Sequence, residues 1–245
     1  MLRVVTQGYI LYYCHKLICI IYVNWGTHMA RIRKIYRNPA QGKNYFVIDA
    51  NFLANKYIPP DRAPNIKEKT RIENCLDWWI EIDLQLNNNK ARVYIPDLCI
   101  AETFKVLAQK YYDKWFQNYN KYSKARRCLI KDITVSDKTL RSYDRQIKYH
   151  DISTSRDIII AVDRFYEVFY KAGLTVQLPD LVLLATAKYL IDFYDIPRNR
   201  LHIVTLDRKL RGGSKKIQEL PNAYDPTISQ DNRGKVFISQ QPRMI

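Results

Sequence analysis

Four acidic residues, far apart in this chain of 245 residues, each follow a hydrophobic stretch or a strand-like segment. A carboxylate at the carboxyl end of a buried strand, or early in the next helix, points into the crevice where parallel α/β sheets bind ligands. Four converging carboxylates repel one another unless cations neutralise them, and hard oxygen ligands suit Mg²⁺ or Mn²⁺. The pattern therefore predicts a metal-dependent phosphodiesterase. The four residues are Asp49 after the run 45–48, Glu102 after Pro96, Asp180 after Leu178-Pro179, and Asp207 after the run 201–206.

If these carboxylates meet, they could bind two metal ions that activate a water molecule and stabilise the leaving oxygen. Asp49 is the first choice for a bridging ligand, because its strand is expected at the centre of the sheet. Glu102 and Asp180 would complete the coordination directly or through water. Asp207 is expected to lie further out.

Each carboxylate also has a purely structural interpretation. Aspartate is a common helix N-cap, so Asp49, Asp180 and Asp207 could each do no more than accept hydrogen bonds from helix amides. Glu102 could be an ordinary exposed helix residue.

The residues around the four carboxylates, in their order along the chain, resemble the PIN-domain ribonuclease family over roughly residues 44–240. The resemblance implies a magnesium- or manganese-dependent endoribonuclease with Asp49, Glu102, Asp180 and Asp207 as catalytic and metal-binding residues. Its motifs are Asp49-Ala50-Asn51-Phe52-Leu53, the spacing from Pro96 to Glu102, Leu178-Pro179-Asp180 running into Leu183-Leu184-Ala185-Thr186-Ala187, and Val204-Thr205-Leu206-Asp207-Arg208.

Two neutral polar residues each lie two positions from one of these carboxylates. Asn51 follows Asp49, and Thr205 precedes Asp207. Such side chains can orient a carboxylate or a water without adding charge. The alternatives are a helix-start residue for Asn51 and a strand former for Thr205.

The composition is strongly basic, with 40 Lys and Arg against 24 Asp and Glu, a net charge of +16 and a pI near 9.6. This surplus favours a polyanionic partner, RNA first and an anionic membrane surface second. Aromatic and basic residues alternate over 111–122, and a flexible basic loop is expected at 208–216; both could bind nucleic acid or be ordinary solvated surfaces. The candidate RNA-binding residues are Lys121, Lys124, Arg126, Arg127, Arg208, Lys209, Arg211, Lys215 and Lys216.

Strand-like and helix-like segments alternate along the chain, which predicts an α/β fold. We expect a three-layer α/β/α arrangement around a central parallel sheet of about five strands, with a helical insertion around 110–160. Expected strands cover 45–49, 92–95, 130–135, 201–206 and 236–239. Expected helices cover 51–57, 66–86, 97 to about 115, 158–171 and 180–194.

Residues 44–240 are expected to form the nuclease domain, and residues 1–43 an N-terminal extension. The apolar stretch 9–25 is short for a membrane span. Residues 1–28 could be an interfacial anchor or the product of an upstream start codon, with Met29 as the true start. The five cysteines form no Cys-x-x-Cys pair and predict neither a disulfide framework nor a zinc site, which suits a cytoplasmic protein.

The leading hypothesis is a metal-dependent ribonuclease, either a toxin-type enzyme or an RNA-processing enzyme. RNA is the expected substrate, and an antitoxin-like protein or a second copy of the chain is a candidate partner. Two alternatives stay open: a catalytically silent PIN-like module that binds RNA or protein, and a structure-specific DNA nuclease whose 110–160 region clamps a strand.

Overall fold

Five parallel strands form one sheet in the computed structural model, in the order β3-β2-β1-β4-β5. The structure describes residues 43–133, 148–228 and 236–237. These all belong to a compact unit at Ala40–Ile245; a separate unit, Met1–Pro39, lies outside the described residues, so the expectations for 1–28 stay predictions. The strands are β1 Asn44–Ile48, β2 Ala91–Pro96, β3 His150–Ile152, β4 Leu201–Val204 and β5 Ala223–Tyr224.

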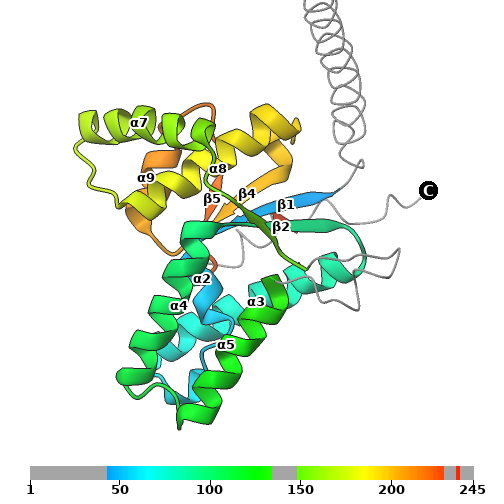
Figure 1. Ribbon diagram of the computed structural model, residues 1–245, viewed down its shortest axis with the longest axis vertical. Helices are drawn as coiled ribbons and strands as arrows, with labels where there is room; N and C mark the ends of the chain where they lie inside the picture. The colour runs from blue at the N-terminus through cyan, green and yellow to red at the C-terminus, as the bar shows by residue number, and fades with distance from the viewer. Residues whose placement is uncertain (1–42, 134–147, 229–235, 238–245) are drawn as a thin grey trace, which may run out of the picture. The chain divides into compact units, whose positions relative to one another are not determined.

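Helices cover both faces of the sheet, which confirms the predicted three-layer α/β/α fold. In Figure 1, α7, α8 and α9 lie above the sheet, and α2, α3, α4 and α5 lie below it. The helices are α2 Ala50–Asn55, α3 Ile66–Asn87, α4 Asp97–Tyr112, α5 Tyr119–Ile133, α7 Arg156–Lys171, α8 Leu178–Tyr194 and α9 Arg208–Ser214, with short 3₁₀ turns η1 Pro60–Arg62 and η2 Arg198–Arg200.

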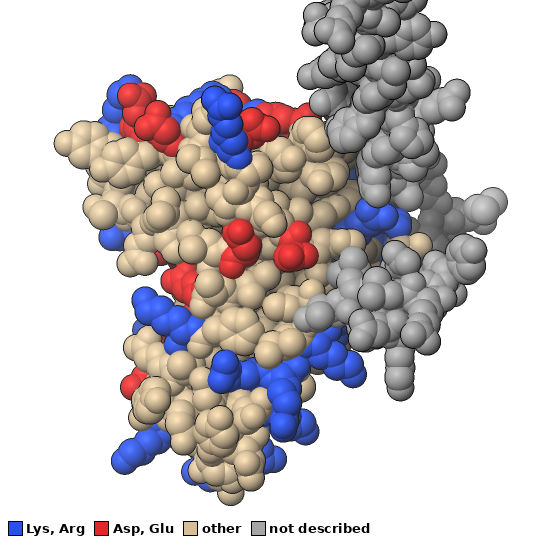
Figure 2. Space-filling model, viewed as in Figure 1, with Lys and Arg blue, Asp and Glu red and all other residues tan. Residues whose placement is uncertain are grey.

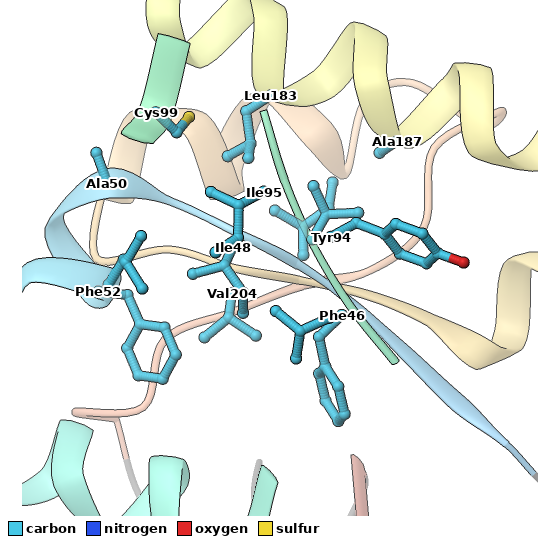
Figure 3. Packing of buried hydrophobic residues seen from close by; sticks show 14 of the residues in the cluster. Phe46, Ile48, Ala50, Phe52, Tyr94, Ile95, Cys99, Leu183, Ala187 and Val204 are labelled. Carbon is cyan, nitrogen blue, oxygen red and sulfur yellow. The ribbon is translucent and has the colours of Figure 1, made fainter. Parts of the chain in front are cut away.

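The central strand β1 is buried on both faces, because helices cover the sheet from both sides. Each of its residues is buried, and Phe46, Val47 and Ile48 are fully so. Figure 3 shows Leu183 of α8 on one side of the sheet and Phe52 of α2 on the other. This two-sided burial is why the sequence shows a continuous apolar run here rather than an alternating one.

Local signals set several helix ends. Asn65 Oδ1 accepts the backbone N–H of Glu68 at the start of α3, and Ser155 caps α7 in the same way. Gly173 follows α7 with a φ of 66°, a left-handed conformation that glycine adopts without steric cost. Gly173 thus supplies the left-handed residue that follows the end of α7.

Two predicted strands are wrong. Residues 130–133 belong to helix α5, which buries Tyr122, Ala125 and Leu129 at helical spacing, and the third strand is His150–Ile152. Residues 134–135 lie outside the described residues. Val236 and Phe237 are helical, 238–239 are not described, and the fifth strand is Ala223–Tyr224.

The aromatic residues of 111–122 pack mainly against one another. Helix α4 ends at Tyr112 rather than near Trp115, and the chain turns with Lys114 at a φ of 63°. Tyr111 stacks on Tyr122 with ring centroids 4.7 Å apart, and Trp115 is buried. These contacts join α4 to α5, so most of these rings serve the core.

Within the described residues, no helix is both long and apolar enough to cross a membrane. Cys75, Cys99 and Cys128 are free thiols.

Candidate carboxylate site

The strand order places two of the acidic residues on either side of a reversal in the sheet. From β1 the chain builds outward through β2 and β3, then returns to the opposite side of β1 with β4. Ligands of open α/β sheets bind outside the carboxyl ends of the strands at such a reversal. Asp49 follows β1 directly, and Asp207 lies three residues after the end of β4, with Thr205 directly after that strand.

Asp49 is buried at this point, with 5% of its surface exposed. Its Oδ2 accepts a hydrogen bond from Thr205 Oγ1 at 3.0 Å. The same Thr205 oxygen accepts the backbone N–H of Asp207 at 3.0 Å. The fully buried Thr205 side chain thus links the carboxylate that follows β1 to the backbone that follows β4.

The Asp49 carboxylate is electrostatically strained. Its pKa is raised to about 7, mainly by burial and also by the nearby Asp180 and Glu102 carboxylates, against the opposing effect of the Thr205 hydrogen bond. Burial also raises the pKa of Asp180 to about 6, with Asp207 and Glu102 adding to the rise and the Gln177 N–H opposing it. The fold therefore brings Asp49, Glu102 and Asp180 into electrostatic range of one another, and Asp207 into range of Asp180.

Two of the four also serve as helix caps. Asp180 Oδ2 accepts the backbone N–H of Gln177 at 3.1 Å in a capping box at the start of α8. Asp207 Oδ1 accepts the backbone N–H groups of Lys209 and Leu210, which begin α9. Asp49 precedes α2 but makes no side-chain capping hydrogen bond. Capping therefore accounts for Asp180 and Asp207 and leaves the burial of Asp49 unexplained.

The carboxylate oxygens of the site suit a hard divalent cation, but the carboxylates do not lie close enough together to bind one ion jointly. A cation beside Asp49 would relieve the repulsion that raises its pKa. In the described part of the chain, however, no three His, Cys, Asp or Glu side chains are grouped closely enough to hold one metal ion. The two helix caps contribute to this separation. They hold one oxygen of Asp180 and one oxygen of Asp207 in hydrogen bonds with backbone amides.

The predicted basic loop at 208–216 is mostly a helix, so the expectation of a flexible loop is wrong. Helix α9 runs to Ser214, and a Cβ added at Gly213 would lie 2.1 Å from Phe169 of α7. The Phe169 ring thus fills the space that a side chain at position 213 would occupy, and any larger residue would have to displace it. Arg211 forms an ion pair with the buried Asp225 at 2.9 Å, so its charge is already neutralised inside the fold. The exposed basic side chains of this segment are Arg208, Lys209, Lys215 and Lys216.

The other basic candidates lie on α5 and are exposed: Lys121, Lys124, Arg126 and Arg127. Lys121 and Lys124 line a cavity of about 370 Å³. The Arg126 guanidinium lies 5.8 Å from the centre of the Phe104 ring. Figure 2 shows basic side chains gathered over the lower part of this face, with acidic side chains above them.

A second cavity, of about 240 Å³, adjoins Asp207 and is lined by Asn51 as well. Asn51 is exposed at the start of α2. Two basic side chains that the sequence did not single out, Arg71 of α3 and Lys110 of α4, also line this cavity. Nothing in the local sequence distinguishes them from other cations on helix surfaces.

Comparison with known proteins gives matches to solved structures only. No family model matches the chain, and no curated protein matches its sequence. A chain of FitAcB from Neisseria gonorrhoeae matches with a TM-score of 0.47 and 14% identity, covering 75% of this chain and 99% of that one. A chain of VapBC2 from Rickettsia felis, bound to a promoter DNA fragment, matches with a TM-score of 0.44 and 10% identity, covering 74% and 98%. VapBC-1 from nontypeable Haemophilus influenzae matches with a TM-score of 0.43 and 15% identity, covering 75% and 98%. These values are too low to transfer an activity to this chain.

Proposed function

We propose that this protein is a metal-dependent endoribonuclease that hydrolyses RNA phosphodiester bonds at the carboxylate site. One observation carries the proposal: Asp49 is buried at the sheet reversal with its pKa raised to about 7, and Asp180 and Glu102 contribute to that rise. Burying a carboxylate near others is costly unless a cation compensates. Such an arrangement is typical of functional sites rather than of structural ones.

Asp49, Glu102 and Asp180 would hold Mg²⁺ or Mn²⁺, with Asp207 further out. When bound, such an ion lowers the pKa of a coordinated water and stabilises charge on the phosphoryl oxygens. Thr205 holds Asp49 by its hydrogen bond and sets the direction in which the carboxylate points. The Gln177 N–H fixes Oδ2 of Asp180, so Oδ1 would be the oxygen available to a cation.

The basic surface supports RNA as the substrate class. The chain carries a net charge of +16, and α5 presents five exposed Lys and Arg side chains. Cationic side chains of this kind bind phosphates whatever the base sequence. The proposal includes a toxin-type or an RNA-processing role in the cytoplasm, with an antitoxin-like protein or a second copy of the chain as partner.

The capping bonds of Asp180 and Asp207 favour one alternative, a catalytically silent module that binds RNA. In that case the carboxylates would serve the fold alone. The two functions differ in one respect: only the nuclease requires a divalent cation.

Incubation of the purified protein with labelled single-stranded RNA, duplex RNA and branched DNA tests the proposal. We expect cleavage of RNA with Mg²⁺ or Mn²⁺ and none with EDTA. Glu102→Gln should abolish cleavage, whereas Asp163→Asn, at an exposed position on α7, should not. RNA binding without cleavage under all metal conditions would favour the silent module, and preferential cleavage of branched DNA would favour a DNA nuclease.

A further inference from the structure

The cavity beside Asp207 is lined by side chains of both charges. Arg71 of α3 and Lys110 of α4 are its cationic residues, and Asp207, the N-cap of α9, is its acidic residue. Asn51 and Asn55 of α2, four residues apart and therefore on one face of the helix, also line it. Its volume of about 240 Å³ far exceeds the roughly 10–15 Å³ that one water molecule requires, so it admits a group larger than a single ion.

Arg71 has hydrogen-bonding capacity that the described residues do not use. One of its terminal nitrogens pairs with Glu68 one turn earlier on α3. Its Nε is buried and has no hydrogen-bond partner within the described residues. Because a buried donor is costly to leave unpaired, this nitrogen indicates an acceptor that is supplied by a ligand or by water.

Lys110 is held in place without a carboxylate partner in the described part of the chain. Its Nζ lies 3.5 Å from the centre of the Trp115 ring, in a cation–π contact. Burial lowers the pKa of Lys110 and the nearby Arg71 guanidinium lowers it further, while the Glu68 and Asp113 carboxylates oppose this shift. Because the net effect still lowers the pKa, an anion bound between the two cations would stabilise the charged form of Lys110.

We propose that Arg71 and Lys110 form a subsite for one phosphate group of the RNA strand, next to the carboxylate site. The choice of RNA as the ligand rests on the proposed function. Arginine suits this task because its fork of N–H donors matches phosphate geometry, and the lysine adds a point charge. Asn51 donates its side-chain amide to the same group. A phosphate held here lies beside Asp207, which lines the same cavity, so Arg71 and Lys110 act as positioning residues rather than catalytic ones.

Binding of a short fluorescein-labelled single-stranded RNA, measured by anisotropy in EDTA over a range of salt concentrations, tests the subsite. Lys110→Gln should reduce the magnitude of the slope of log affinity against log salt by about 0.7, the value for one lost phosphate contact. In 0.1 M salt this corresponds to binding about fivefold weaker than wild type. Lys110→Arg should restore most of the loss.

Lys105→Gln is the matched control, because Lys105 is exposed on the same helix and does not line the cavity. Arg71→Gln should weaken binding at least as much as Lys110→Gln, and thermal melting of each variant checks that the fold is intact. If Arg71→Gln does not fold, Lys110→Gln and its arginine counterpart decide the result.

The outcomes separate this subsite from the proposed function. If the wild type cleaves RNA but Lys110→Gln binds like Lys105→Gln, the subsite is wrong and the nuclease stands. If the wild type never cleaves but its binding depends on Lys110, the nuclease is wrong and the subsite stands as a binding site. If the wild type binds no RNA, the subsite is overturned.

Discussion

Asp49 and Thr205 form the central pair of side chains in the carboxylate site, because the threonine hydroxyl donates a hydrogen bond to the carboxylate. The hydrogen bond of 3.0 Å between their side chains links the ends of two strands that are far apart in sequence. Strand β1 ends at Ile48, and β4 begins 153 residues later, at Leu201. A threonine hydroxyl can donate to the carboxylate and accept from the Asp207 N–H at once. The carboxylate is thereby oriented without being neutralised.

Asp49→Asn should abolish RNA cleavage in Mg²⁺ while RNA binding is retained or strengthened. The asparagine amide lacks the negative charge that would hold a cation. Loss of this negative charge also reduces the repulsion of phosphates. Cleavage rate and binding affinity of the same preparation are the measurements. Cleavage at the wild-type rate would remove Asp49 from the catalytic site.

The same substitution should stabilise the protein in EDTA at alkaline pH. The folded-state pKa of Asp49, about 7, lies above its ordinary value of 3.8, so the folded state binds the proton more tightly. This contribution to stability is fully present below about pH 4 and is lost as the pH rises through about 7. The Asp49→Asn variant has no titrating group at this position, so it does not lose this stability as the pH rises. The raised pKa of Asp180, about 6, destabilises the wild type in the same way at high pH.

Thermal melting in EDTA between pH 5 and pH 8 measures this effect. The melting temperature of Asp49→Asn should exceed that of the wild type most at the upper end and least at the lower end. A variant less stable than wild type throughout would show that the Asp49 charge is already compensated within the fold.

At the scale of elements, α9 is positioned by its contact with α7. Gly213 lies against the Phe169 ring, whereas a Cβ at the adjacent Gly212 would meet nothing within 4 Å. This contact places the first turn of α9, whose N-cap is Asp207, beside the carboxylate site.

Gly213→Ala should destabilise the protein by about 1–3 kcal/mol, the usual cost of overpacking a core. Gly212→Ala is the matched control and should stabilise the helix by up to about 1 kcal/mol, because alanine favours helix over glycine. Urea denaturation of both variants gives the two free energies of unfolding. Equal effects would mean that α9 shifts freely on α7. Phe169→Leu combined with Gly213→Ala should recover part of the lost stability.

At the scale of the whole molecule, the positive charge is distributed over separate elements. Basic side chains of α5 and of the segment from α9 to Lys216 are exposed, and the total charge is +16. Such a surface binds a polyanion through several weak contacts rather than through one strong pocket.

Binding of single-stranded RNA by the wild type should therefore weaken steeply with salt. With about four to six phosphate contacts, each contributing roughly −0.7, the slope of log affinity against log salt should be about −3 to −4. Fluorescence anisotropy at several salt concentrations provides the slope. A slope near zero would mean that the basic surface serves another partner.

Much of the fold was predictable from local sequence. The apolar runs at 45–48 and 201–206 identify two central strands, helical spacing identifies α3, and the cap at Asp180 with the stop at Pro197 identifies α8. Since strands that alternate with helices form a parallel sheet, the α/β/α fold class followed as well. The sequence also placed four acidic residues at strand ends or early in the helices that follow, where such sheets bind ligands.

Only the tertiary structure decided the details that depend on contacts between distant segments. Strands β3 and β5 have three and two residues, too few for a periodic pattern, so partner strands rather than local sequence define them. The raised pKa of Asp49 and the grouping of Arg71 with Lys110 likewise arise where separate elements meet. Local sequence determines which element a residue enters, whereas burial and electrostatic coupling depend on what the fold packs around it.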